Sequence, residues 1–205
     1  MNKLLVSLVL SLGVAGSAYA QNVIVGDAEA GQAKAAMCGA CHGADGNSTS
    51  ANFPKLAGQG ERYLLKQLVD IKQGDRVVVE MTGILDQYSE QDLADLAAYF
   101  SSNTMSGGVA NPELVELGEE IFRGGDLTEG LPACSGCHSP TGKGNEPAGF
   151  PHLAGQHAAY TVKQLTDFRE GGRTNDGDAR IMQMVAQKLS NAEIKAVSDY
   201  IQGLR

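Results

Sequence analysis

The four cysteines of this chain all fall in two copies of one short pattern. The pattern is Cys-x-x-Cys followed at once by His, and its members are Cys38, Cys41 and His42 in the first copy and Cys134, Cys137 and His138 in the second. Most folds that use a Cys-x-x-Cys pair have no need of an adjacent histidine. The two motifs therefore restrict the chain more than any other feature of the sequence.

A Cys-x-x-Cys-His motif is the attachment pattern of c-type haem. Two thiols on one turn of chain reach the two vinyl groups on one edge of a porphyrin and form thioethers. The adjacent imidazole then lies under the ring, where it ligates the iron. The sequence predicts two covalent haem c groups and their iron, attached and ligated by the six residues of the two motifs.

Three other uses of the cysteines explain the sequence less well. A zinc site would employ two Cys-x-x-Cys pairs but would leave both trailing histidines without a role. A thioredoxin-like redox pair expects a single motif near a βαβ pattern, which is absent. Two structural disulfides, the ordinary expectation for an exported chain, also fail to account for the histidines.

The first residues of the chain have the features of an export signal. Lys3 supplies a charged start, residues 4–12 are apolar, and Ala18 and Ala20 form a small-x-small cleavage site. The apolar run is short for a membrane span, and an uncleaved anchor is the alternative. We predict a signal peptide over residues 1–20, cleavage near Ala20 and a periplasmic location.

The net charge excludes some partners. The formal charge of the whole chain is −8. Nucleic acids and anionic membrane surfaces attract basic patches, so this balance disfavours nucleic acid as a partner. An acidic surface instead favours steering towards basic patches on another protein.

The sequence repeats itself. Residues 52–59 and residues 149–156 share the core Phe-Pro-x-Leu-Ala-Gly-Gln, and Tyr63 recurs as Tyr160. The haem motifs recur with nearly the same separation, so the repeat unit is one haem domain. The chain thus contains two such domains.

The domain boundaries follow from the repeat and from a Gly/Ser-rich stretch between its copies. We predict an N-terminal domain over residues 21–104, a linker over 105–112 and a C-terminal domain over 113–205.

Each half has a helical pattern. Asp27 can cap a short first helix, which runs into the first motif. Ser89-x-x-Asp92 and Ser190-x-x-Glu193 are capping boxes before the last helix of each half. Gly118 stands in the second half where Gly31 stands in the first, but nine more residues separate it from the following motif. No period-2 run is long enough for a sheet, so we predict an all-α protein.

Two helical modules, each with Cys-x-x-Cys-His near its start and a methionine before its last helix, resemble class I cytochrome c domains. The tandem arrangement resembles the dihaem cytochrome c4 family, and the stretches 53–59 and 164–171 add to the likeness over residues 24–205. The resemblance implies that the loops at Pro54 and Pro151 lie beside the histidine ligands, whose imidazole N–H groups their carbonyls hold.

The sixth iron ligand decides the chemistry. A methionine thioether in that position gives a six-coordinate iron, which is suited to electron transfer because it leaves no position open for a substrate. Among the six methionines, Met81 and Met182 form a matched pair, each eight residues before a capping box. We predict that they ligate the two irons. Met184 is the alternative to Met182, but it aligns with Gly83 and is expected to be a packing residue.

Other polar residues are weaker candidates. His152 and His157 match Lys55 and Gly60 of the first half, so we expect structural or surface roles, with bis-histidine ligation as the alternative. Four further residues are expected to be solvated, with contacts to haem propionates as the alternative: Tyr63, Tyr160, Arg76 and Arg180.

These features predict a one-electron carrier rather than an enzyme. By resemblance, its donor is a quinol-oxidising complex of a respiratory chain and its acceptor a terminal oxidase, with loose membrane association left open. A small dihaem peroxidase-like enzyme and the cytochrome subunit of a larger dehydrogenase, such as a flavocytochrome, are the alternatives.

Overall fold

A computed structural model describes residues 24–205 of the chain. The predicted signal peptide over residues 1–20 lies outside the described residues. Within residues 24–205, none of the helices has the length and apolar character needed to cross a membrane. This part of the chain is helical and has isolated β-bridges but no strands.

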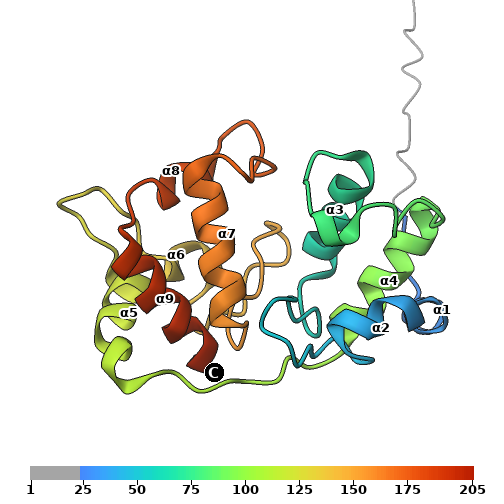
Figure 1. Cartoon of the computed structure of the whole chain (residues 1–205), viewed down its shortest axis with the longest axis horizontal. Helices are drawn as coiled ribbons and strands as arrows, with labels where there is room; N and C mark the ends of the chain where they lie inside the picture. The colour runs from blue at the N-terminus through green and yellow to red at the C-terminus, as the bar shows by residue number, and fades with distance from the viewer. Residues whose placement is uncertain (1–23) are drawn as a thin grey trace, which may run out of the picture.

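The helices fall into two groups, separated by the linker that runs along the bottom of Figure 1. The first group contains α1 (Ala28–Lys34), α2 (Ala36–His42), α3 (Glu61–Gln73), the 3₁₀ helix η1 (Val79–Met81) and α4 (Glu90–Ser102). The second contains α5 (Pro112–Gly124), α6 (Ser135–His138), α7 (Ala158–Glu170), α8 (Ile181–Ala186) and α9 (Asn191–Gly203).

Local side-chain chemistry explains where several helices begin. The Asp27 carboxylate accepts from two backbone N–H groups of α1, as the sequence predicts. Both predicted capping boxes are confirmed: Ser89 with Asp92 starts α4, and Ser190 with Glu193 starts α9.

In each group the first and last helices cross closely: α1 packs on α4, and α5 packs on α9. A glycine makes each approach possible. A Cβ on Gly31 would lie 2.0 Å from the Asp95 carbonyl oxygen, and one on Gly118 would lie 2.4 Å from that of Ala196. The matched glycines of the sequence therefore mark the same helix crossing in both domains.

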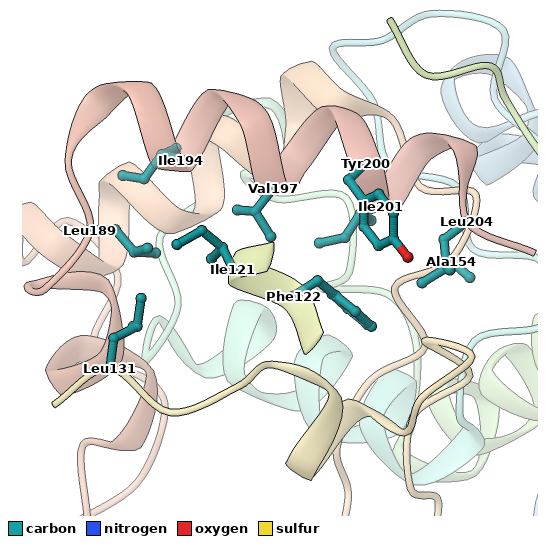
Figure 2. Packing of buried hydrophobic residues seen from close by; sticks show 10 residues of the cluster. All are labelled: Ile121, Phe122, Leu131, Ala154, Leu189, Ile194, Val197, Tyr200, Ile201 and Leu204. Carbon is teal, nitrogen blue, oxygen red and sulfur yellow. The ribbon is translucent and has the colours of Figure 1, made fainter. Parts of the chain in front are cut away.

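Each domain has its own apolar core. The C-terminal core joins α5, α7 and α9 around Phe122, Ile194 and Val197, as Figure 2 shows for its buried members. The N-terminal core is smaller and is built on Leu64, Leu96 and Phe100. Cys38 packs against the N-terminal core and Cys134 against the C-terminal one, so each haem motif borders a core.

One detail differs from the sequence predictions, and a second was not predicted at all. The first helix does not run unbroken into the first motif, because Ala35 separates α1 from α2. The extra residues of the second half form a small loop that is closed by a reciprocal backbone pair between Asp126 and Leu131. This loop precedes α6 and leaves Leu127 90% exposed at its tip.

The two domains contact each other through repeated residues. The Gln59 side chain donates to the carbonyl of His152 and accepts from its N–H, at 2.8 and 2.7 Å. Gln156, the repeat counterpart of Gln59, makes the same pair of hydrogen bonds with Lys55, both at 2.9 Å. The domain junction is thus nearly symmetric, with each glutamine holding the backbone of the opposite domain.

Candidate functional site

The histidine of each motif lies in a closely similar environment. His42 is the last residue of α2 and His138 is the last residue of α6. Both residues are buried, with exposed fractions of 8% and 7%. The Nδ1 atom of His42 lies 2.9 Å from the Pro54 carbonyl oxygen, and that of His138 lies 3.0 Å from the carbonyl of Pro151. The predicted contact between these loops and the histidines is confirmed.

These hydrogen bonds fix which nitrogen of each ring can bind a metal. A carbonyl oxygen only accepts, so Nδ1 carries the proton and Nε2 keeps its lone pair. Burial also lowers the pKa of both His42 and His138, which keeps the rings neutral. Each imidazole is therefore oriented and protonated as an iron ligand must be.

The cysteines of both motifs form no disulfide in the described residues. In each motif the first cysteine is half-buried against the core and the second is exposed. Burial raises the pKa of the Cys38 thiol and raises that of Cys134 to about 11, as expected for thiols that border an apolar core. Within residues 24–205, no three His, Cys, Asp or Glu side chains gather as a metal site would require.

The methionines differ in exposure. Met81 ends η1 and Met182 lies in the first turn of α8, and both are half-buried. Met184, the alternative ligand, is 54% exposed. The two members of the matched pair thus occupy corresponding, partly enclosed positions before the last helix of their domains.

These side chains fit covalent haem c. A haem needs two thiols for its vinyl groups, one neutral imidazole and an apolar wall, and each domain supplies all of them. The apolar side chains that pack against each core together with the first cysteine include the half-buried Leu65 and Leu68 of α3 in the first domain and Val162 and Leu165 of α7 in the second. The donor set therefore agrees with the cofactor predicted from the motifs.

The other two histidines lie at the domain junction. His157 Nε2 is 2.9 Å from both the carbonyl oxygen and the hydroxyl of Ser48, in the other domain. His152 Nδ1 is 2.9 Å from the Gly58 carbonyl, again across the junction. These contacts give both histidines a structural role and leave bis-histidine ligation without support.

The structure also shows a functional candidate that sequence reasoning missed. Arg173, only 8% exposed, lies at the junction with Arg76, Tyr63 and Tyr160. Arg180, selected from the sequence, is instead exposed and donates to Gln183 in its own domain. The repeat could have identified Arg173, because it follows Tyr160 by the same interval at which Arg76 follows Tyr63.

A family model described as "Cytochrome c" matches residues 28–104 and 115–205. The chain is 69% identical to a cytochrome c4 of Pseudomonas aeruginosa over the full length of both proteins. It is 36% identical to a "Thiosulfate dehydrogenase electron acceptor" of Thiomonas intermedia, over 82% of this chain and 78% of that protein.

A solved structure has a similar fold. The crystal structure of reduced recombinant cytochrome c4 from Pseudomonas stutzeri matches with a TM-score of 0.87 and 66% sequence identity. That match covers 88% of this chain and all of the crystallised chain. The two-domain arrangement, and not only the single domain, is therefore shared.

Proposed function

This chain belongs to the cytochrome c family, in its dihaem cytochrome c4 branch, and from that premise we propose how its residues carry electrons. It is an electron-transfer protein with covalent haem c. In our proposal Cys38 and Cys41 attach the first haem, which His42 and Met81 ligate. The corresponding residues of the second domain are Cys134, Cys137, His138 and Met182.

When bound, each haem supplies an iron that cycles between its ferric and ferrous states. The residues of the chain then set the coordination and the access of solvent. The Pro54 and Pro151 carbonyls hold the Nδ1–H groups of His42 and His138, which orients each ring and makes its Nε2 more basic. Met81 and Met182 would supply a thioether to the iron of their own domain, and this ligand would close the iron to exogenous ligands.

The observation that carries this assignment is the repetition of the whole arrangement. Both domains place a buried histidine against a proline carbonyl and a half-buried methionine before the last helix. A peroxidase-like enzyme would need one open axial position for its substrate. Two matched methionines therefore favour a carrier with two closed haems.

Absorption spectra of the oxidised and reduced protein test this function. We expect low-spin spectra, with the far-red band of a thioether bound to ferric iron, and no spectral change when carbon monoxide or cyanide is added at neutral pH. Rapid binding of either ligand together with turnover of hydrogen peroxide would instead support the peroxidase-like alternative.

We further propose a periplasmic location, with a quinol-oxidising complex as donor and a terminal oxidase as acceptor. The acidic balance of the chain supports docking to basic patches on such proteins. Membranes that contain the oxidase should oxidise the reduced protein, at a rate that falls as ionic strength rises. A rate independent of both the oxidase and salt would reject this pairing.

The cytochrome subunit of a larger dehydrogenase is the second candidate. It is favoured by the similarity to the Thiomonas intermedia protein, whose name describes an electron acceptor for thiosulfate dehydrogenase. Co-purification of the native protein with a dehydrogenase or flavin subunit would support this candidate. Isolation as a single chain that membranes reduce with quinol would support the respiratory carrier.

A further inference from the structure

The second domain has a loop that the first domain lacks. Residues 125–133 join the end of α5 to Cys134, whereas α1 of the first domain leads into its motif almost directly. In Figure 1 this loop projects at the left, on the side of the second domain that faces away from the first. A protein that binds to this loop therefore binds beside the second haem motif.

Several contacts hold the loop in one conformation. Leu131 is 1% exposed and belongs to the C-terminal core. The backbone N–H groups of Asp126 and Leu131 donate to each other's carbonyls, at 2.9 and 2.7 Å. The Lys188 ammonium group donates to the Glu129 carbonyl at 2.7 Å and ties the loop to the segment before α9. Leu127, which is 90% exposed, is therefore presented to solvent by a loop with a fixed shape.

A cleft of about 480 Å³ lies between this loop, the end of α5 and the start of α9. Its lining combines apolar side chains with carboxylates, and we call it the acidic cleft. The side chains that matter here are Leu117, Ile121 and Leu127 on the apolar side and Glu120, Asp126 and Glu193 on the acidic side. The acidic cleft thus offers an apolar wall and negative charge to the same ligand.

The described chain supplies no cation to these carboxylates. Within residues 24–205, no Lys, Arg or His nitrogen lies within 4.0 Å of Glu120, Asp126 or Glu193. One oxygen of Glu193 accepts from the Ser190 N–H at the start of α9, which leaves the other oxygen for a ligand. The C-terminal end of α5, the negative end of its helix dipole, also borders the acidic cleft. The acidic cleft therefore favours a positively charged ligand.

The first domain shows which side chain fits such a place. Asp92, at the start of α4, is the repeat counterpart of Glu193. The Lys34 Nζ atom lies 2.6 Å from the carboxylates of both Asp92 and Asp95, so a lysine of α1 compensates the charge there. In the second domain Ile121 stands in the place of Lys34. The corresponding carboxylate, that of Glu193, is thus left without its lysine.

We propose that the acidic cleft receives a lysine side chain of a redox partner protein, and that this contact docks the partner beside the second haem. The aliphatic stem of a lysine packs on apolar side chains such as Leu117 and Leu127, while its ammonium group donates to the carboxylates. A lysine from another protein thus replaces the one that the first domain carries in its own chain. Because the first domain lacks the loop, the docking is specific to the second domain.

This inference rests on the proposed function, because it requires a partner that exchanges electrons with the protein. It goes beyond that function by naming the surface, the chemistry of the partner and the domain that the partner meets. It also locates the electrostatic contribution to docking. The dependence of electron exchange on salt should come mainly from the carboxylates of the acidic cleft, and not from the negative charge of the chain as a whole.

The test compares two double variants of the intact haem protein that change the charge by the same amount. Glu120→Gln/Glu193→Gln neutralises two carboxylates of the acidic cleft, and glutamine keeps the capping geometry at the start of α9. Glu113→Gln/Glu116→Gln neutralises two exposed carboxylates of α5 that lie outside the cleft lining. Reduced protein is mixed with membranes that contain the terminal oxidase, and oxidised protein with membranes that contain the quinol-oxidising complex, at several ionic strengths.

We expect Glu120→Gln/Glu193→Gln to slow electron exchange with at least one of the two membranes by about fivefold at low ionic strength, the size expected for two exposed ion pairs, and to weaken its salt dependence. Glu113→Gln/Glu116→Gln should keep the wild-type rate within about twofold. Leu127→Ser should slow the same exchange without any change of charge, because it removes part of the apolar wall. Equal effects of the two double variants, or wild-type rates in the cleft variant, would overturn the proposal.

Cross-linking with a water-soluble carbodiimide locates the contact directly, because the reagent joins a carboxylate to a lysine amine that lies against it. After reaction with the same membranes, mass spectrometry of the wild type should find a lysine of the partner joined to Glu120, Asp126 or Glu193. These cross-links should be lost or reduced in Glu120→Gln/Glu193→Gln. Cross-links found only on carboxylates outside the acidic cleft would overturn the proposal.

The outcome separates this inference from the proposed function. If the wild type and the cleft variant exchange electrons with the membranes at the same rate, the docking site is rejected and the carrier function stands. If the wild type exchanges electrons with neither membrane, the proposed partners are rejected, and the docking site is rejected with them.

Discussion

In the proposed function, one methionine in each domain closes the iron of that domain to exogenous ligands. We predict that Met81→Ala and Met182→Ala each abolish one thioether–iron bond, and that each opens one haem to carbon monoxide. The potential of that haem should fall on the order of 0.1 V or more, since axial ligands set haem potentials over a range of about 0.8 V. Absorption spectra and redox titration of each variant measure both effects.

Met184→Ala is the matched control for Met182→Ala, because it removes a second methionine on the same helix that is 54% exposed. It should keep the low-spin spectrum of both haems. Loss of the thioether band in Met184→Ala, with Met182→Ala unaffected, would show that the ligand assignment in the second domain is wrong.

A second residue-scale prediction concerns acid stability. The buried Asp95 carboxylate accepts a hydrogen bond from Lys34 at 2.6 Å, and this contact is the main reason why the pKa of Asp95 is lowered. Lys34 likewise lowers the pKa of Asp92. Carboxyls with a lowered pKa in the folded state stabilise it above their unfolded pKa of about 4, and that stabilisation is lost as the pH falls below it.

The other domain suggests the control variant. Ile121 and Ala196 stand at the positions of Lys34 and Asp95, so an apolar pair replaces the ion pair. In the double variant Lys34→Ile/Asp95→Ala the thermal midpoint should fall less steeply than in the wild type as the pH is lowered from about 5 to about 3. If the thermal midpoints of the wild type and the double variant fell equally steeply with pH, the ion pair between Lys34 and Asp95 would not be a source of acid-sensitive stability.

At the scale of helices, the close crossing of α5 and α9 depends on Gly118. A Cβ there would lie 2.4 Å from the Ala196 carbonyl and 2.6 Å from the Tyr200 Cβ. We predict that Gly118→Ala separates the two helices and lowers the free energy of unfolding by about 1–3 kcal/mol. Chemical denaturation of the intact protein measures the change.

Gly124→Ala provides the comparison within the same helix. Nothing lies within 4 Å of a Cβ at this position, so the substitution meets no steric barrier. Its stability should be unchanged or greater by up to about 1 kcal/mol, because alanine favours helix more than glycine does. Equal destabilisation by both substitutions would mean that the helix crossing is not what selects glycine at Gly118.

The helices themselves were largely predictable from the sequence, because their signals are local. The capping boxes at Ser89 and Ser190 depend on residues three positions apart, and both are formed. The break at Ala35 was not predictable, since no proline or capping side chain marks it. The loop closed by Asp126 and Leu131 was recognisable only as an insertion, although the Asp126 carboxylate also accepts from the backbone N–H groups of Thr128 and Glu129 within it.

At the scale of the whole molecule, the sequence predicted the parts of the candidate site but not their assembly. Repeats showed that Gln59, Gln156 and the tyrosines were duplicated, yet not that they meet across a junction. Which surfaces of two similar domains dock is a long-range property. Lys55 illustrates this point: it is 6% exposed and donates to the carbonyls of Ser106 and Gly155, a burial that no local pattern indicates.

The junction is nearly symmetric, but the surroundings of the two haems are not. The second domain has the additional loop before α6, Met184 where the first has Gly83, and Ile121 where the first has Lys34. Differences in burial and hydrogen bonding shift haem potentials. We therefore expect the two haems to have unequal potentials and to exchange electrons through the docked domains.

A potentiometric titration of the intact protein, with the electrons counted per chain, tests this account most directly. We predict two electrons per chain, taken up in two one-electron steps at different potentials, with both haems retained after denaturation. A single step shared by both haems would contradict the prediction that the two sites are not equivalent. Uptake of fewer than two electrons would contradict the presence of two haems, and release of haem on denaturation would contradict their covalent attachment.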